Sequence, residues 1–562
     1  MSALHADAIE AVEIPFARAR AHAAQAEGIL TSDEMIRKPH SDLEAMLVGQ
    51  GMEWARLMLE ENLRLRAQLE RTTSVVGADG IERESTRDSE RHLETLLGRV
   101  PVQRLAYQAP GATDLHPMDA ALNLPREMFS HGIRRMVARE AAKCSFDEVV
   151  DNLRELTGAS VAKRQVEELA IRAAQDFDAF YEQRAAVRDP KEDLLIISTD
   201  GKGIVMRHED LREGTRRAAE KSGRKLETRL TPGEKSNRKR MAQVATVYSI
   251  APFPRGPGDI LHSLRAADEL DAKRPRPTDK RVWASVEKTA RSVIRDAFEE
   301  ALRRDPEKAR RWVVLVDGEP KQLRAVKAEA RRAGVKVTIL ADIVHVIEYV
   351  WDAARALFGG SCAKAEKWVA DRLLALLTGR SGGDVAKTIR WWEARDKKLD
   401  DAAHAAIDKT CGYLADRTRT RMLRYQDALR DGLPIATGVI EGACRYVVKD
   451  RMDRTGARWS LTGAEAVLRL RAIRASKDFD AYWAFHLEQG KERNHATKTA
   501  RSPIRFPHRS RASSGSSDRS CWHSCRPRRA TPGGDARSGS SSSIRWAPRS
   551  RWSRPSRATC GW

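Results

Sequence analysis

The chain has 562 residues, of which 41% are hydrophobic and 32% are charged. This length predicts several domains, and the composition is that of a globular protein rather than a disordered or membrane-spanning one. Lys and Arg number 101 against 79 Asp and Glu, and the resulting net charge of +22 favours a polyanionic partner.

Two features of the sequence bear on its compartment. The N-terminus lacks the basic-then-apolar pattern of a signal peptide, and no apolar run reaches the roughly 18 residues of a membrane span. We therefore expect the protein to stay where it is made, and its seven scattered cysteines to be reduced thiols.

Residues 1–110 are charged and mostly helix-like, which predicts a helical N-terminal region. An apolar stripe of roughly helical period runs through residues 43–69 and consists of Leu47, Met52, Trp54, Leu57, Leu59 and Leu63. A packing or dimerisation helix is the simpler interpretation, and a DNA-contacting helix is the alternative.

Residues 111–190 contain a pattern typical of a helix-turn-helix. Ser145 and Glu148 form a capping-box pair, Gly158 can end the first helix, and Ser160 can cap the second. In a DNA-binding region, the start of the second helix meets base edges and phosphates, whereas plain helical packing fits the pattern equally well. The residues expected at that position are Lys163, Arg164 and Gln165.

Residues 191–345 change to strand patterns. Compact apolar or alternating runs near 193–206, 241–250, 311–320 and 335–346 predict four strands. A helical stretch separates the last two, so we expect those two to pair in parallel within an α/β sheet.

Between the first two strands lies a strongly basic segment, residues 212–240. We interpret it as a phosphate-contacting insertion rather than a solvated loop, and we expect DNA contacts from Arg238, Lys239 and Arg240. Residues 346–432 predict an all-helical insertion whose tryptophans are mainly core residues, and residues 433–495 predict further helices. These tryptophans are Trp351, Trp368, Trp391 and Trp392.

The composition changes abruptly near residue 501. The stretch that follows is rich in Arg and Ser and has neither Leu nor Val, so we expect residues 496–562 to be a disordered tail. A shifted reading frame that appended non-native sequence and a nucleic-acid-binding tail are the two interpretations.

Three acidic residues carry the candidate chemistry. Asp200 and Asp317 each end an apolar strand at the sheet edge where sites form in α/β proteins, although Asp-Gly is also a common turn. Glu441 is near the start of a later helix, and Arg445 and Lys449 follow at four-residue steps, which predicts one shared face. A surface ion-pair ladder is the alternative. Clustered carboxylates suit two Mg²⁺ (or Mn²⁺) ions and not zinc.

Four phrases occur in order: STDGKG, VLVDGEP, ADIVHV and GVIEGACRYVVKDRMDRTGARW. Together they resemble bacterial insertion-sequence transposases of the ISKra type, DDE enzymes with an RNase H-like catalytic core, over about residues 40–495. The resemblance implies catalytic, metal-binding roles for Asp200, Asp317 and Glu441. Asp342 and His345 resemble a D-x-x-H element and would support the site, or they form a structural Asp–His pair.

The resemblance implies an α/β RNase H-like core with an all-helical insertion, preceded by an all-α helix-turn-helix region. It further implies a DNA transposase that binds the ends of its insertion sequence and performs metal-dependent strand cleavage and transfer. Its partners would be terminal repeats and target DNA, bound by at least a dimer in the bacterial cytoplasm at the nucleoid, without a membrane. A nuclease without strand transfer and an inactive DNA-binding remnant are the alternatives.

Overall fold

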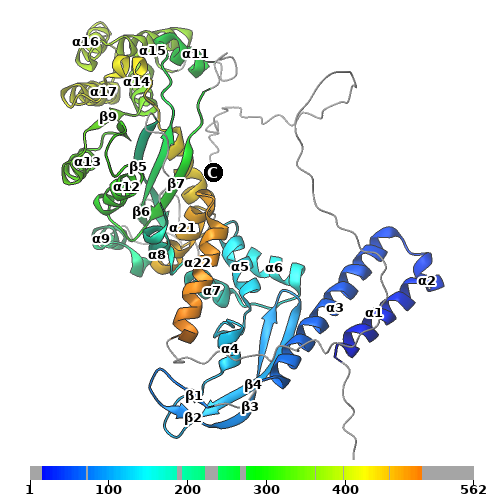
Figure 1. Ribbon diagram of the computed structural model, residues 1–562. Coiled ribbons are helices and arrows are strands. Elements are labelled where there is room, and N and C mark those ends of the chain that lie inside the picture. Colours follow the sequence, from blue (N-terminus) through cyan, green and yellow to red (C-terminus); the bar gives the residue numbers. More distant parts are fainter. Residues whose placement is uncertain are drawn as a thin grey trace, which may run out of the picture. The chain divides into compact units, whose positions relative to one another are not determined.

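A mixed five-stranded sheet forms the centre of the fold (Figure 1). The computed structural model describes residues 15–70, 74–185, 193–221, 238–265, 274–360, 362–396, 398–454 and 456–496. Residues 497–562 of the predicted tail lie outside the described residues, and so do residues 222–237 of the basic segment. Of that segment, the structure describes only the two ends, residues 212–221 and 238–240.

The sheet has the strand order β7-β6-β5-β8-β9. β5, β6 and β7 pair antiparallel, whereas β8 pairs in parallel with both β5 and β9. The predicted parallel pair is β8–β9, joined by helix α13, and is confirmed. The bounds are β5 (Leu194–Val205), β6 (Lys239–Ile250), β7 (Thr278–Ser285), β8 (Trp312–Val316), β9 (Val337–Ala341) and α13 (Pro320–Ala333).

Strand β7 was not among the predicted strands. It begins with the polar residues Thr278, Asp279 and Lys280 and lies at the sheet edge, where only its second half is fully buried. Its apolar run is therefore too short to stand out from the sequence alone.

Helices cover both faces of the sheet, because neighbouring residues of its strands point to opposite sides. Ala245 and Trp283 pack with α12 (Ala290–Arg304) in one core cluster. Val244 and Val282 pack with α19 (Gly438–Ala443) and α21 (Leu461–Ala475) in another. The catalytic candidates from distant segments thus meet around one three-layer unit.

The predicted helical insertion is confirmed. Its helices are α14 (Ile343–Phe358), α15 (Ala363–Leu377), α16 (Gly382–Glu393), α17 (Asp401–Arg419) and α18 (Tyr425–Arg430). Trp368 is buried as predicted, but Trp391 is 53% exposed, with Arg395 stacked 3.3 Å from its ring centroid. Adjacent helical residues point about 100° apart, so Trp391 and Trp392 cannot both face one core.

The N-terminal region is only partly helical. Helix α3 (His40–Gln68) confirms the predicted helix and follows α1 (Ala17–Leu30) and α2 (Asp33–Ile36). Leu57 and Leu63 are buried, whereas Leu47 and Trp54 of the same stripe are exposed.

The prediction of helix up to residue 110 is wrong, because β3 (Ser85–Thr95) and β4 (Gly98–Gln108) form a long antiparallel hairpin. Leu93, Val100 and Val102 of the hairpin pack on Leu63. Every residue of β3 except Leu93 is polar or charged, which hides the strand in the sequence. Two short strands precede the hairpin, β1 (Val75–Val76) and β2 (Glu82–Arg83).

The capping box of the helix-turn-helix region is confirmed: Ser145 caps α6 (Phe146–Thr157) with Glu148, and Gly158 ends it at φ 67°. Ser160 does not cap α7 (Lys163–Ala173). The N-cap is Ala162, whose N–H donates to Gln165 Oε1 at 3.2 Å. A glutamine reaching back from the helix therefore replaces the expected serine.

Other helices of this region are α4 (Pro117–Ala121), α5 (His131–Ala141) and α8 (Phe177–Gln183). Between β5 and β6 lie η1 (His208–Asp210) and α9 (Glu213–Lys221), and α11 (Pro257–Arg265) precedes β7.

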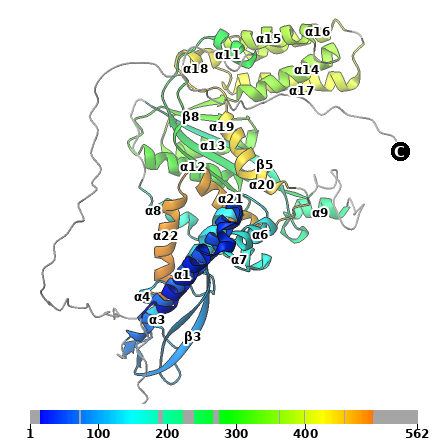
Figure 2. The same ribbon diagram turned by 90° about the vertical axis from the view of Figure 1, so that its right-hand side faces the viewer.

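The last described segment is helical, as predicted, but not regular. After α19 the chain continues as a π-helix, η2 (Cys444–Lys449), so the α-helical four-residue register predicted for Glu441, Arg445 and Lys449 is wrong beyond Ala443. The remaining elements are α20 (Asp450–Met452), α21, α22 (Phe479–Lys491) and η3 (Glu492–Ala496) (Figure 2). No described helix is long and apolar enough to cross a membrane.

Candidate active site

Three aspartates lie in one row across adjacent parallel strands. Ser198 of β5 is opposite Leu315 of β8 in the last pair of that ladder, and Asp200 and Asp317 each follow two residues later. Val316 of β8 is opposite Ala341 of β9, so the next pair is Asp317 with Asp342. The Asp342 N–H donates to the Val316 carbonyl at 2.9 Å and fixes this end of the row.

Asp200 is half-buried in the middle of β5. Its Oδ1 accepts the Gly201 N–H at 2.6 Å, and its Oδ2 accepts the Cys444 thiol at 3.1 Å. Burial and the charge of Asp200 raise the pKa of Cys444 well above its usual range, so the thiol stays protonated and remains a donor. This contact joins β5 to the helix that carries Glu441.

Asp317 follows β8 in a turn held by the helical insertion. Its Oδ1 accepts the Glu319 N–H at 3.0 Å, and its backbone carbonyl accepts the Tyr413 hydroxyl at 3.2 Å. Gly318 has φ 93°, and a Cβ there would lie 2.2 Å from Arg417 Nε. The turn therefore requires glycine on two grounds, backbone conformation and space.

Neither Asp200 nor Asp317 forms an ion pair within the part of the chain that the structure describes. Both side chains are half-buried, in a protein rich in Arg and Lys. Carboxylates brought close together without a protein cation would repel each other, and a bound cation would relieve that repulsion.

Asp342 is fully buried and caps α14. Its Oδ1 accepts the N–H of Val344 at 3.0 Å and of Thr437 at 3.3 Å, while its Oδ2 accepts the Thr437 hydroxyl and His345 Nδ1, the latter at 3.3 Å. Burial would raise the pKa of Asp342, but His345 and Thr437 lower it, and Asp342 raises the pKa of His345 to about 9. At neutral pH the two residues form an ion pair.

Glu441 lies against this pair. Ligand atoms of Asp342, His345 and Glu441 all lie within 4.8 Å of one another, and burial followed by the charge of Asp342 raises the pKa of Glu441. The cluster could hold a metal ion, since two carboxylates and an imidazole are suitable donors. A metal-ligating imidazole must be neutral, so such binding would compete with the proton on His345.

The structure thus sorts the predicted site residues into two neighbouring groups. Asp200 and Asp317 each lie two residues after the last β5–β8 pair, and Glu441 is grouped with Asp342 and His345. Cys444 links the two groups through Asp200. Sequence reasoning missed Cys444, Thr437 and Tyr413; only the position of Cys444, one turn after Glu441, was a usable signal.

The predicted DNA contacts near α7 are exposed but already have protein partners. Lys163 Nζ lies 2.7 Å from Asp147 Oδ2, and Arg164 Nε lies 3.2 Å from Glu168 Oε1. Exposed ion pairs of this kind are weak, so these side chains can exchange their partners for phosphates. Gln165, in contrast, is used as a helix cap.

The predicted DNA contacts of the basic segment differ in burial. Arg238 is only 7% exposed, and the half-buried Arg240 donates to the carbonyls of Val286 and Asp210 at 2.8 and 3.1 Å. Lys239 is exposed. Near Glu441, both Arg445 and Lys449 are exposed, and Arg445 lies 3.7 Å from Asp450.

No protein-family model matches the chain, and no curated protein matches it in sequence. The function is therefore inferred from the geometry of the site.

Proposed function

We propose that the protein is a DDE-type DNA transposase with an RNase H-like core. The observation that carries this proposal is the row of Asp200, Asp317 and Asp342, with Glu441 facing it from a later helix. The strand order supports it too, because three antiparallel strands followed by two parallel ones is the arrangement of an RNase H-like sheet.

In this proposal the acidic residues have different roles. Asp200 and Asp317 would hold one cation between them, and Glu441 would complete a second site, with the Asp342–His345 pair fixing its position. Two Mg²⁺ or Mn²⁺ ions, when bound, would stabilise the entering and leaving oxygens of an in-line attack at phosphorus. The exposed cations Arg445 and Lys449 lie near Glu441 and would hold DNA phosphates.

The test is strand cleavage and joining on duplexes that carry the DNA flanking the gene. Asp200→Asn and Asp317→Asn should abolish cleavage in Mg²⁺ while the protein still binds DNA, because the amide removes a metal ligand and keeps the shape. Asp352→Asn on α14 is the matched control, since its carboxylate forms only an exposed ion pair with Arg355.

The same assay separates the alternatives. A nuclease would cut the duplexes but give no joined product from pre-cut ends. For an inactive DNA-binding remnant, Asp200→Asn would leave DNA binding unchanged, and neither protein would cleave. Either result would replace the transposase proposal.

A further inference from the structure

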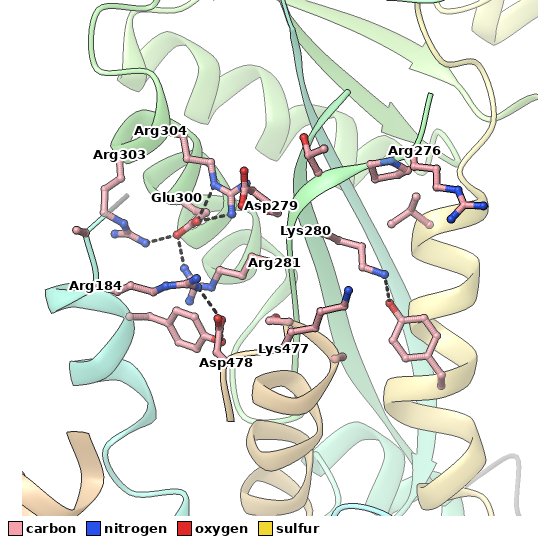
Figure 3. A pocket seen from close by; sticks show the side chains of 18 of the residues that line it. Arg184, Arg276, Asp279, Lys280, Arg281, Glu300, Arg303, Arg304, Lys477 and Asp478 are labelled. Carbon is pink, nitrogen blue, oxygen red and sulfur yellow. Dashed lines mark hydrogen bonds and ion pairs between the residues drawn. The ribbon is translucent and has the colours of Figure 1, made fainter. Parts of the chain in front are cut away.

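A basic cavity of about 970 Å³ lies behind the helix that carries Glu441 (Figure 3). The start of β7 and the C-terminal ends of α8, α12 and α21 bound it, and Gly438 and Val439 of α19 complete its wall. Seven Arg or Lys side chains line it against three acidic ones. Its volume is that of a site for a sizeable ligand, and its charge selects an anion.

On one wall of the cavity, arginines neutralise the acidic side chains of Glu300 and Asp478. Glu300 forms ion pairs with three arginines, Arg281, Arg303 and Arg304, the last two at 2.8 Å. Asp478 is paired in the same way: its Oδ2 accepts from Arg184 at 2.6 Å and from the Tyr181 hydroxyl at 3.0 Å. Glu300 and Asp478 therefore have little charge left to repel an anion.

Three cations on the other side have no such partner. Within the described ranges, Arg276, Lys280 and Lys477 form no ion pair with a carboxylate, and Lys280 donates only to the Tyr446 hydroxyl, at 3.3 Å. Figure 3 shows these three side chains apart from the Glu300 cluster, around the start of β7. They are the groups available to a ligand.

Lys477 has a left-handed backbone conformation, which is unusual for a residue with a side chain. It ends α21 at φ 64°, with the N–H of Lys477 bonded to Arg474 and that of Asp478 to Ile473, the pattern in which glycine is preferred. A lysine in this left-handed conformation is strained relative to glycine, so the backbone does not explain its presence. Its side chain, which lines the cavity, offers an explanation.

The cavity and the candidate active site share one helix. Gly438 and Val439 line the cavity, and Glu441 follows them within one turn of α19, so the cavity and Glu441 lie within one helix width of each other. A helix with its side chains is about 10–12 Å across, which at 3.4 Å per nucleotide corresponds to about three nucleotides of a DNA strand. A strand that passes Glu441 can reach the cavity within that length.

We propose that Arg276, Lys280 and Lys477 bind the phosphodiester backbone of a DNA strand about three nucleotides from the phosphate at Glu441. This inference rests on the proposed function, because it assumes that DNA is the ligand of the Glu441 site. It adds a second phosphate site, within about one helix width of the acids.

The experiment measures the affinity of the full chain for a 30-base-pair duplex across a salt series, with EDTA present so that no cleavage occurs. Each phosphate contact contributes about 0.9 to the slope of log K against log salt. The triple variant Arg276→Gln, Lys280→Gln, Lys477→Gly should lower that slope by two to three. Lys477→Gly alone should lower it by about one and leave the thermal midpoint unchanged or higher, because glycine suits that conformation.

The control removes the same charge elsewhere: Lys367→Gln, Lys387→Gln and Arg419→Gln on the helical insertion, all exposed and paired with acidic neighbours. It should keep the wild-type slope. If the cavity variant keeps that slope too while wild type binds DNA, the cavity proposal is overturned and the transposase proposal stands. If wild type does not bind DNA in any salt, both proposals fall.

Discussion

Gly318 shows at the scale of a single residue how the helical insertion shapes the site. We predict that Gly318→Ala destabilises the protein by about 1–3 kcal/mol and abolishes most cleavage, because the new Cβ meets Arg417 and the φ of 93° disfavours alanine. Chemical denaturation and the cleavage assay measure the two effects.

Gly412→Ala is the matched control for this substitution. Gly412 lies in α17, the helix of Arg417, and a Cβ there meets nothing within 4 Å. Because alanine is the better helix former, this variant should be more stable by about 0.5–1 kcal/mol and fully active. Equal behaviour of the two variants would contradict the role assigned to Gly318.

Glu300 makes the stability of the protein depend on pH in the acid range. Burial would raise the pKa of Glu300, but Arg281 and Arg304 lower it to about 2, from an ordinary value of 4.5. The stabilisation is therefore complete above pH 4.5 and is lost as the pH falls towards 2, in total about 3 kcal/mol. Denaturation between pH 3 and 7 should show this loss in the wild type.

In Glu300→Gln the part of this pH dependence that Glu300 contributes should disappear, and stability at pH 7 should fall. Glu299→Gln removes a neighbouring but exposed carboxylate that pairs with Arg332, so its effect should stay below about 0.5 kcal/mol. If Glu300→Gln keeps the full wild-type dependence of stability on pH, another ionisable group is responsible for that dependence.

At this scale the sequence predicted the acids better than their partners. Asp200 and Asp317 could be found because each follows an apolar run, but only Asp317 follows the end of its strand, since β5 continues past Asp200 to Val205. The thiol that bonds Asp200 is 244 residues away, and the Thr437 hydroxyl that bonds Asp342 is 95 residues away. Contacts over such separations depend on the tertiary packing, which local patterns do not encode.

At the scale of elements, helix caps were predictable where the side chain bonds its own helix. We predict that Ser145→Ala costs about 1 kcal/mol, because it removes a cap that accepts the Glu148 N–H at 3.2 Å. Ser160→Ala should change stability by less than about 0.5 kcal/mol, since Ala162 and not Ser160 begins α7. Thermal denaturation of the two variants compares them, and a larger effect at Ser160 would refute this cap assignment.

Other elements escaped prediction for different reasons. The first strand of the β3–β4 hairpin is polar or charged at every position except Leu93, and β7 is an edge strand with a polar start. The π-helix η2 contacts β5 through the bond from the Cys444 thiol to Asp200, a long-range contact that local patterns do not encode. Strands β5 and β8, by contrast, were clear because β5 begins with a continuous apolar run and β8 consists of one.

At the scale of the whole molecule, residues from five distant segments meet at the carboxyl edge of the parallel strands: β5, β8, the start of α14, α17 and α19–η2. The sequence predicted the strand–helix–strand unit and the helical insertion, and with them the order of the acids. It did not predict that Glu441 would group with Asp342 and His345, because that grouping depends on where α19 packs.

The central claim is that Asp200, Asp317 and Glu441 act together on divalent cations. Anomalous diffraction from crystals soaked in MnCl₂ tests it most directly. We predict two Mn²⁺ peaks, one between Asp200 and Asp317 and one at Glu441, and loss of the first peak in Asp200→Asn. A single peak at Asp342, His345 and Glu441 that is unaffected by Asp200→Asn would contradict the claim.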